Sequence, residues 1–436
     1  MLLPLFTVSS SAIEDPEVRY SPYCAVYNIE NDKYCYEESI DVQIAPAGTV
    51  KIMTAVLALE HYSDRLDEEI TVQGSWLNEV QKGSHTSSFM ANETLTAEKI
   101  ISALVINSGN DAAYILANSI SGSTAAFVER MNAKAEELGM DNTFYTNPAG
   151  TDSDGMYTSV RDVVRISAYA NANAKYVELT DSPSFELPPT SMNYGRTLYN
   201  RNHFVTNRNN TRYYEKSVFG FSCSNTGNAG WCLSVAGKNE SGLTYIVVVM
   251  GAENPKTAMT DAEKDKYFVS GYEDARLLLD WAYDSYDYFT IIDTSTMICE
   301  VPVSLSSEVD HVMLLPSEKI VAFLPKDTNL DTAITKNWTL NEQSLEAPLD
   351  KGEVVGMLTV SYGDTVLGEV PLITKSHVDR STGLFIGKKA VDIITHPVFI
   401  ICAVIVIISI IAYVVFMAKH ISVKKQVVKF KTNKKS

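Results

Sequence analysis

Residues 45–55 of the chain read APAGTVKIMTA. From position 50 onward the pattern predicts an amphipathic helix with Lys51 near its first turn, and the apolar residues that fall roughly on one face are Val50, Met53, Val56, Leu57 and Leu59. A lone lysine at such a position is usually a solvated helix residue. Whether Lys51 has a chemical role therefore depends on its surroundings, and its neighbour Gly48 has no side chain to offer.

A second stretch, residues 107–113, reads NSGNDAA and follows the apolar run at 100–106. Ser108 and Asn110 form a Ser-x-Asn tripeptide, which by itself occurs by chance in most chains of this length. Its distance from Lys51 and the helical patterns on both sides make the match specific.

Together these stretches resemble motifs of the penicillin-binding D-alanyl-D-alanine carboxypeptidases, low-molecular-mass serine peptidases that trim peptidoglycan stem peptides. In that family the first motif is Pro-Ala-Ser-x-x-Lys, in which the serine attacks the peptide carbonyl and the lysine handles its proton. The resemblance implies that Lys51 is the base, that Ser108 relays protons and that Asn110 binds substrate. The position of the nucleophilic serine is occupied by Gly48.

The third family motif is Lys-Thr-Gly, whose lysine and threonine meet the terminal carboxylate of the substrate. Residues 229–233 resemble the strand that follows this motif, and counting back from them puts Ser222-Cys223-Ser224 at the motif and Asn225 after it. The resemblance makes Ser222, Cys223, Ser224 and Asn225 substrate-binding positions. We expect the motif's cation to be lost, because Lys216 is six residues upstream, about 20 Å along a strand.

Two functions are compatible with these replacements. In the first, the protein is a catalytically silent, wall-facing relative that binds stem peptides or a partner. The resemblance puts the N–H groups of the family's oxyanion hole at Gly48 and Asn225, and because backbone groups survive any side-chain change, we expect a pocket that can still take a ligand. In the second, it is an active D-Ala-D-Ala carboxypeptidase with a substitute nucleophile such as Thr49 or Ser108. We favour the first, because Thr49 is turned about 100° around the helix from position 48. Labelled penicillin separates the two.

The expected effect of restoring the serine follows from the same reasoning. Gly48→Ser should place a hydroxyl near Lys51 and Ser108, yet give slow or no acylation by labelled penicillin. The reason is the lost cation, because a charge-assisted hydrogen bond is worth about 1.5–3 kcal/mol. Restoring residues 222–224 to Lys-Thr-Gly as well should give more acylation.

The resemblance covers about residues 20–375 and implies an α/β (α+β) fold, with a penicillin-binding/β-lactamase-like transpeptidase domain followed by a small all-β domain. Short alternating strands after position 287 agree with the second domain. The boundaries that we expect are a remnant signal peptide or N-terminal tail (1–19), the carboxypeptidase-like domain (20–287), the β domain (288–375), a stalk (376–397), a transmembrane helix (398–417) and a basic cytoplasmic tail (418–436).

Residues 398–417 form an uninterrupted apolar run without a charge, long enough at about 30 Å to cross a bilayer. The last 18 residues carry seven lysines and no acid, which places them in the cytoplasm by the positive-inside rule. The body, acidic within a chain of net charge −17, is then outside the cell membrane. Such an acidic body argues against nucleic acid as a partner.

The six cysteines, at positions 24, 35, 223, 232, 299 and 402, include no Cys-x-x-Cys, and no histidines are paired at ligand spacing. The sequence thus supports neither a metal site nor a cofactor. If Gly227-Asn228 is a two-residue hairpin turn, Cys223 faces Cys232 across the strands. A disulfide there is then possible in geometry, although we expect two unpaired thiols.

Overall fold

The computed structural model describes residues 14–206, 212–253, 260 and 270–432, with side chains as far as Ser422. The described chain forms two compact units, one of residues 14–287 with 323–327, and the other of residues 288–322 with 328–432. Most of the expected N-terminal tail and the side chains of the basic tail lie outside the described residues.

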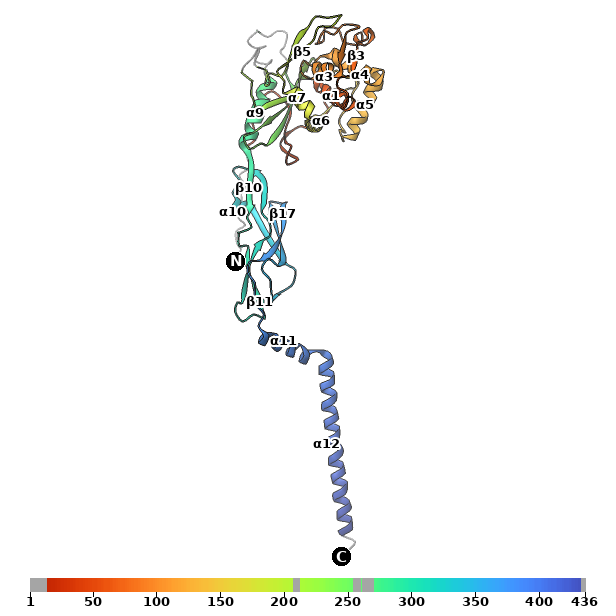
Figure 1. Ribbon diagram of the computed structural model, residues 1–436. Helices are drawn as coiled ribbons and strands as arrows, with labels where there is room; N and C mark the ends of the chain where they lie inside the picture. Colours follow the sequence, from red (N-terminus) through yellow and green to blue (C-terminus); the bar gives the residue numbers. More distant parts are fainter. Residues whose placement is uncertain (1–13, 207–211, 254–259, 261–269, 433–436) are drawn as a thin grey trace. The chain divides into compact units, whose positions relative to one another are not determined.

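The first unit is built on a five-stranded antiparallel sheet (Figure 1). In spatial order its strands are β2 (Lys33–Glu38), β1 (Tyr23–Asn28), β9 (Thr244–Ala252), β8 (Gly230–Lys238) and β7 (Val218–Thr226). A hairpin, β1–β2, precedes the first motif in the chain. Strand β9 is buried along almost its whole length, because both faces of the sheet are covered. Helix α9 (Ser270–Ser285) packs on one face of the sheet.

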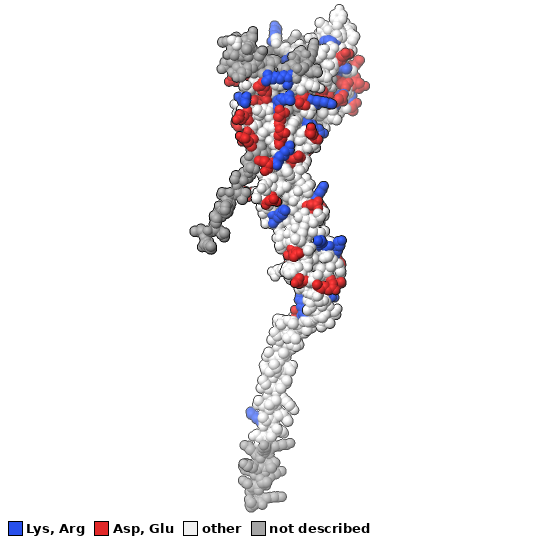
Figure 2. Space-filling view, turned by 90° about the vertical axis from the view of Figure 1, so that its left-hand side faces the viewer, with Lys and Arg blue, Asp and Glu red and all other residues white. Residues whose placement is uncertain are grey.

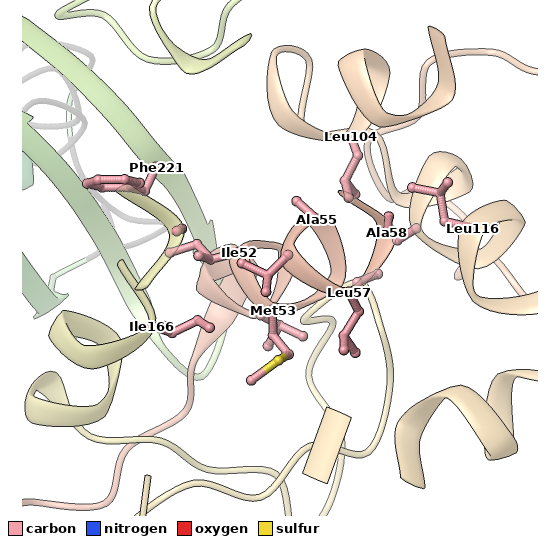
Figure 3. Close-up of a cluster of buried hydrophobic side chains, with 14 of the residues drawn as sticks. Ile52, Met53, Ala55, Leu57, Ala58, Leu104, Leu116, Ile166 and Phe221 are labelled. Atoms are coloured by element: carbon pink, nitrogen blue, oxygen red, sulfur yellow. The ribbon is translucent and has the colours of Figure 1, made fainter. Parts of the chain in front are cut away.

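The other face of the sheet carries a helical layer around α1 (Val50–His61). Figure 3 shows α1 side chains packed against Leu104, Leu116, Ile166 and Phe221. Every residue from Val50 to Leu59 is buried, so α1 is enclosed except at its last two residues, and the expected single apolar face was too narrow a description. The surrounding helices are α3 (Ala97–Val105), α4 (Asn110–Ser121), α5 (Thr124–Glu137), α6 (Val160–Asn171) and α7 (Ala174–Thr180).

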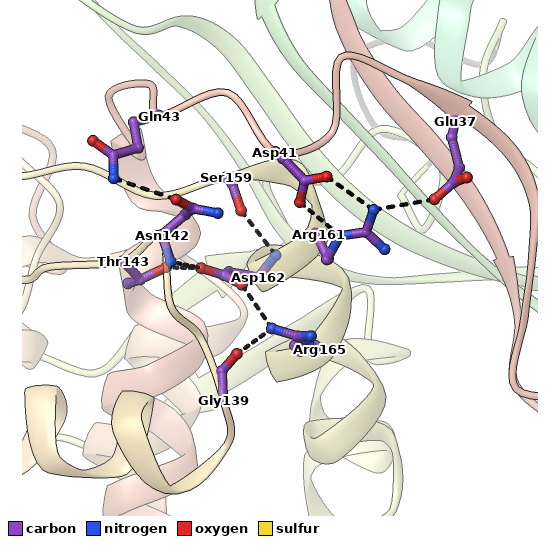
Figure 4. Close-up of polar contacts among 10 residues, drawn as sticks. All are labelled: Glu37, Asp41, Gln43, Gly139, Asn142, Thr143, Ser159, Arg161, Asp162 and Arg165. Atoms are coloured by element: carbon purple, nitrogen blue, oxygen red, sulfur yellow. Dashed lines mark hydrogen bonds and ion pairs between the residues drawn. The ribbon is translucent and has the colours of Figure 1, made fainter.

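Polar contacts fix the start of α6, as Figure 4 shows. The Ser159 hydroxyl caps the helix by accepting from the backbone N–H of Asp162. The buried Asp162 carboxylate accepts from the Asn142 backbone at 2.8 Å and from the Thr143 hydroxyl at 2.8 Å. Each bond satisfies a group that burial would otherwise leave without a partner.

Several short elements complete the first unit. They are the 3-10 turn η1 (Ala47–Thr49), helix α2 (Gly74–Leu77), the pair β3 (Glu69–Thr71) and β4 (Thr94–Thr96), and the pair β5 (Ser184–Leu187) and β6 (Arg196–Tyr199).

The second unit confirms the expected β domain. Its six-stranded sheet has the order β14 (Ile334–Leu340), β16 (Val354–Tyr362), β17 (Thr365–Thr374), β12 (His311–Pro316), β11 (Cys299–Ser304) and β15 (Leu345–Glu346). A separate pair joins β10 (Tyr286–Ile292) to β13 (Ile320–Pro325), and α10 (Leu330–Ala333) precedes β14. Alternate residues of these strands form the core.

Two helices follow the β domain. The expected stalk contains α11 (Thr382–Thr395), and α12 (Pro397–Thr432) includes the apolar run. Residues Pro397–Ser422 of α12 are long and apolar enough to cross a membrane.

Candidate active site

The first motif, the second motif and strand β7 meet at a groove of about 390 Å³. The structure therefore brings together the residues that the sequence singled out, except Ser222, which does not line this groove. Its lining includes Gly48, Lys51, Ser108, Asn110, Cys223, Ser224 and Asn225, together with residues 81–85, 149–152 and Arg201.

Lys51 lies at the base of the groove, with only 8% of the residue exposed. Its ammonium nitrogen donates to the carbonyl of Ala149 at 2.7 Å. Burial, with a smaller contribution from the nearby Arg201 charge, lowers the pKa of Lys51 to about 7. A lysine amine that is partly neutral at neutral pH can accept a proton, as a base must.

The turn that holds Lys51 is itself well ordered by hydrogen bonds. The side-chain oxygen of Asn147 accepts from the backbone N–H groups of Ala149 and Gly150. Gly150 has φ +75°, and a Cβ there would lie 1.9 Å from the carbonyl oxygen of Ala47. Only glycine permits this approach between the turn and the first motif.

Ser108 and Asn110 are placed by the start of α4. Ser108 is half-buried with φ +56°, a conformation uncommon for residues other than glycine, and it lines the groove. Asn110 is the first residue of α4, and its backbone N–H donates to the His85 carbonyl at 2.9 Å. Both side chains of the second motif thus lie in the same groove as Lys51.

Strand β7 is bonded to Gly48 by two serines on the same face of the strand. The Ser224 hydroxyl accepts from the Gly48 backbone N–H at 2.7 Å, and the Ser222 hydroxyl donates to the Gly48 carbonyl at 2.9 Å. The expectation that the Gly48 N–H remains open to a ligand is therefore wrong. It already has a partner, the Ser224 hydroxyl.

Cys223 points the other way from its two serine neighbours. Its thiol contacts the Tyr272 hydroxyl of α9, and burial raises the pKa of Cys223 to about 11. The pairing of β7 with β8 sets Cys223 opposite Leu233 and Cys232 opposite Ser224. The predicted register was wrong by one residue, because the turn closes at Thr226 and Gly230 and is longer than two residues.

Thr49 is not placed to replace the missing serine. It is buried, and its hydroxyl donates to the Pro46 carbonyl at 2.6 Å. It does not line the groove, in contrast to Ser108 and Ser224.

Sequence reasoning missed Arg201, which lies in the groove near Lys51 and Cys223. In the part of the chain that the structure describes, its exposed guanidinium has no ion pair. The groove therefore has a cation, although Lys-Thr-Gly is absent. In the sequence Arg201 is marked only by flanking asparagines, and nothing in their spacing relates it to the motifs.

Among the described residues, no group of His, Cys, Asp and Glu is arranged to hold a metal ion. The groove offers amine, amide, hydroxyl and guanidinium groups beside one carboxylate, that of Asp152, which accepts from the Asn228 backbone N–H. The amine and guanidinium groups suit a polar ligand with a negative charge.

Comparison with known proteins agrees with this geometry. The Peptidase_S11 family (D-alanyl-D-alanine carboxypeptidase) matches residues 12–254, and the C-terminal domain family of penicillin-binding protein 5 matches residues 286–380. DacF of Bacillus subtilis, a D-alanyl-D-alanine carboxypeptidase, is 27% identical over 87% of this chain and 93% of its own. DacC of Escherichia coli, of the same description, is 25% identical over 89% and 91%.

Solved structures show the same fold. Penicillin-binding protein 5 from Haemophilus influenzae superposes with a TM-score of 0.59 at 22% identity, over 85% of this chain and 100% of that one. Penicillin-binding protein 6B from Escherichia coli gives a TM-score of 0.60 at 20% identity, over 84% and 98%. Because one family matches more than half of the sequence and the groove unites its motif positions, the chain belongs to the D-alanyl-D-alanine carboxypeptidase family of low-molecular-mass penicillin-binding proteins.

Proposed function

We propose that this protein is a membrane-anchored, wall-facing member of the family that binds peptidoglycan stem peptides without cleaving them efficiently. The observation that carries the proposal is a groove of about 390 Å³ that keeps Lys51, Ser108 and Asn110 around a residue, Gly48, with no side chain. Removing a nucleophile from a serine peptidase costs about 10⁶ in turnover, so binding is the function left to such a groove.

The ligand class follows from the charge of the groove and the substrate of the relatives. Their names describe enzymes that act at D-alanyl-D-alanine, a peptide end with a free carboxylate. In this chain Arg201 is placed to bind that carboxylate, and a guanidinium can do so with two parallel hydrogen bonds. Asn110 can bond the peptide amide.

The site positions that we carry forward are Lys51 and Ser108 in the places of base and proton relay, and Asn110, Ser224 and Asn225 around the ligand. Ser222 does not line the groove, and its hydroxyl donates to the Gly48 carbonyl. Cys223 contributes backbone to the lining, while its thiol contacts Tyr272.

The membrane anchor and the orientation rest on the C-terminal helix. Within α12, the 26 residues Pro397–Ser422 have the length and composition of a membrane span. On the face shown in Figure 2 its described surface is almost free of charge, whereas acidic side chains are common on the first unit. The domain boundaries given above, with the body outside and the lysine-rich tail in the cytoplasm, remain part of this proposal.

Calorimetric titration with a stem peptide that ends in D-alanyl-D-alanine tests the proposal. We expect saturable binding to the wild-type protein, and at least tenfold weaker binding to Arg201→Gln, since one charge-assisted hydrogen bond is worth about 1.5–3 kcal/mol. The same peptide with a C-terminal amide should bind the wild type as weakly as the free-acid peptide binds Arg201→Gln. Arg130→Gln, an exposed arginine of α5 outside the groove, is the matched control. Absence of binding to the wild type would contradict the proposal.

A further inference from the structure

The position that a Cβ on Gly48 would take is already filled. Built on the backbone, that atom would lie 2.6 Å from the Ser224 hydroxyl oxygen and 2.8 Å from the Ser224 Cβ. A Cβ atom in a folded protein does not come so close to a heavy atom to which it is not bonded, so any side chain at position 48 requires movement of Ser224. The Lys51 amine is also close, at 3.4 Å from the same point.

The contact is a hydrogen bond as well as a packing contact. Ser224 accepts from the Gly48 N–H at 2.7 Å, which is the length of a strong N–H···O bond. The β7 backbone is held close by the bond from the Ser222 hydroxyl to the Gly48 carbonyl. Serine at position 224 and glycine at position 48 therefore depend on each other.

We infer that Ser224 is the residue that holds this groove in a non-acylating form. Its side chain takes the volume of a side chain at position 48, and its hydroxyl occupies the N–H donor that an acyl oxygen would need for stabilisation. The inference rests on the proposed silent function and gives it a structural cause. Acylation is lost through two coupled positions: Gly48, which replaces the serine, and Ser224, which fills the space beside it.

The sequence-based expectation for Gly48→Ser is corrected accordingly. The introduced side chain would collide with Ser224 and would not simply stand beside Lys51. The loss of the motif's lysine is the smaller obstacle, because Arg201 supplies a cation to the groove. Neither Gly48→Ser nor Ser224→Gly alone should acylate, since the first lacks space and the second lacks a nucleophile.

The double substitution Gly48→Ser with Ser224→Gly removes both obstacles. The introduced hydroxyl can then attack the β-lactam carbonyl while the carbon–nitrogen bond of the ring breaks, and its proton passes through the Lys51 amine to the ring nitrogen. The freed N–H at position 48 can donate a hydrogen bond to the acyl oxygen.

The first test measures the packing alone, with no dependence on activity. Gly48→Ala adds a Cβ and no hydroxyl. We expect it to lower the Tm by several degrees in the wild-type background and to leave it unchanged or higher in the Ser224→Gly background, because alanine is otherwise favoured over glycine in a helical turn. Ser222→Gly is the matched control background, in which Gly48→Ala should still lower the Tm. Equal shifts in all three backgrounds would overturn the inference.

The second test follows covalent labelling by fluorescent penicillin on the full-length protein. Gly48→Ser with Ser224→Gly should label at least tenfold faster than Gly48→Ser alone or Gly48→Ser with Ser222→Gly. Equal labelling of the three, including none in any, would refute the role of Ser224. Labelling of the wild type is a different result, since it would refute the silent function itself.

Discussion

The amine of Lys51 is the group in the groove whose charge depends most on the fold. Its pKa falls from 10.5 to about 7 on burial, so the unfolded chain binds more protons between these two values. Stability should therefore rise as the pH increases from 7 toward 10.5, by at most about 1.4 kcal/mol per pH unit from this residue. Urea unfolding across this range should show a steeper rise for the wild type than for Lys51→Met. Parallel pH profiles would contradict a buried, partly neutral lysine.

Two neighbouring residues of α6 allow a matched comparison of buried and exposed charge. Asp162 is 1% exposed and accepts bonds from Asn142 and Thr143, whereas Arg161 forms its ion pair with Asp41 near the surface. Asp162→Asn replaces an accepting carboxylate oxygen with an amide NH2 group, which cannot accept from these donors. We expect it to lower the free energy of unfolding by about 1–3 kcal/mol. Arg161→Gln should cost less than about 1 kcal/mol. Midpoints of urea unfolding give both values, and a reversed order would show that the buried network is not what holds α6.

In strand β7, a shift of one residue in the pairing with β8 decides whether Cys223 and Cys232 can form a disulfide. Directly opposite residues share a face, so Cys223 with Leu233 and Cys232 with Ser224 put the two thiols on opposite faces of the sheet. We expect both cysteines to remain free after oxidation with oxygen, as mass spectrometry of unreduced peptides would show. A Cys223–Cys232 link would require the register that the structure has replaced.

The elements also show which parts of the site the sequence could reveal. Lys51, Ser108 and Asn110 were found because each lies in a short local motif beside a predicted helix, and the family resemblance implied their roles. The approach of Arg201 to Lys51 and the contact of Ser224 with Gly48 depend on segments at least 150 residues apart that meet only in the folded chain. Hairpins, helices and the β domain follow from local patterns. The β7–β8 turn, however, is one residue longer than predicted, so residues that were expected to face one another lie on opposite faces of the sheet.

For the molecule as a whole, the proposed topology predicts the result of limited proteolysis on intact cells. Protease added outside should release a soluble fragment that ends before Pro397, because the proposed topology has α12 across the membrane and the acidic body outside. Antibody against the last residues should detect the tail only after the cells are opened. Recovery of the body in the cytosolic fraction would contradict this orientation.

The central claim, that the groove binds and does not acylate, is tested most directly by the intact mass of the wild-type protein after hours with excess penicillin. With Gly48 in the nucleophile position and Ser224 bonded to its N–H, the mass should stay unchanged. A gain equal to one penicillin molecule would contradict the account, and peptide mapping of the adduct to Ser108 or Ser224 would identify the substitute nucleophile.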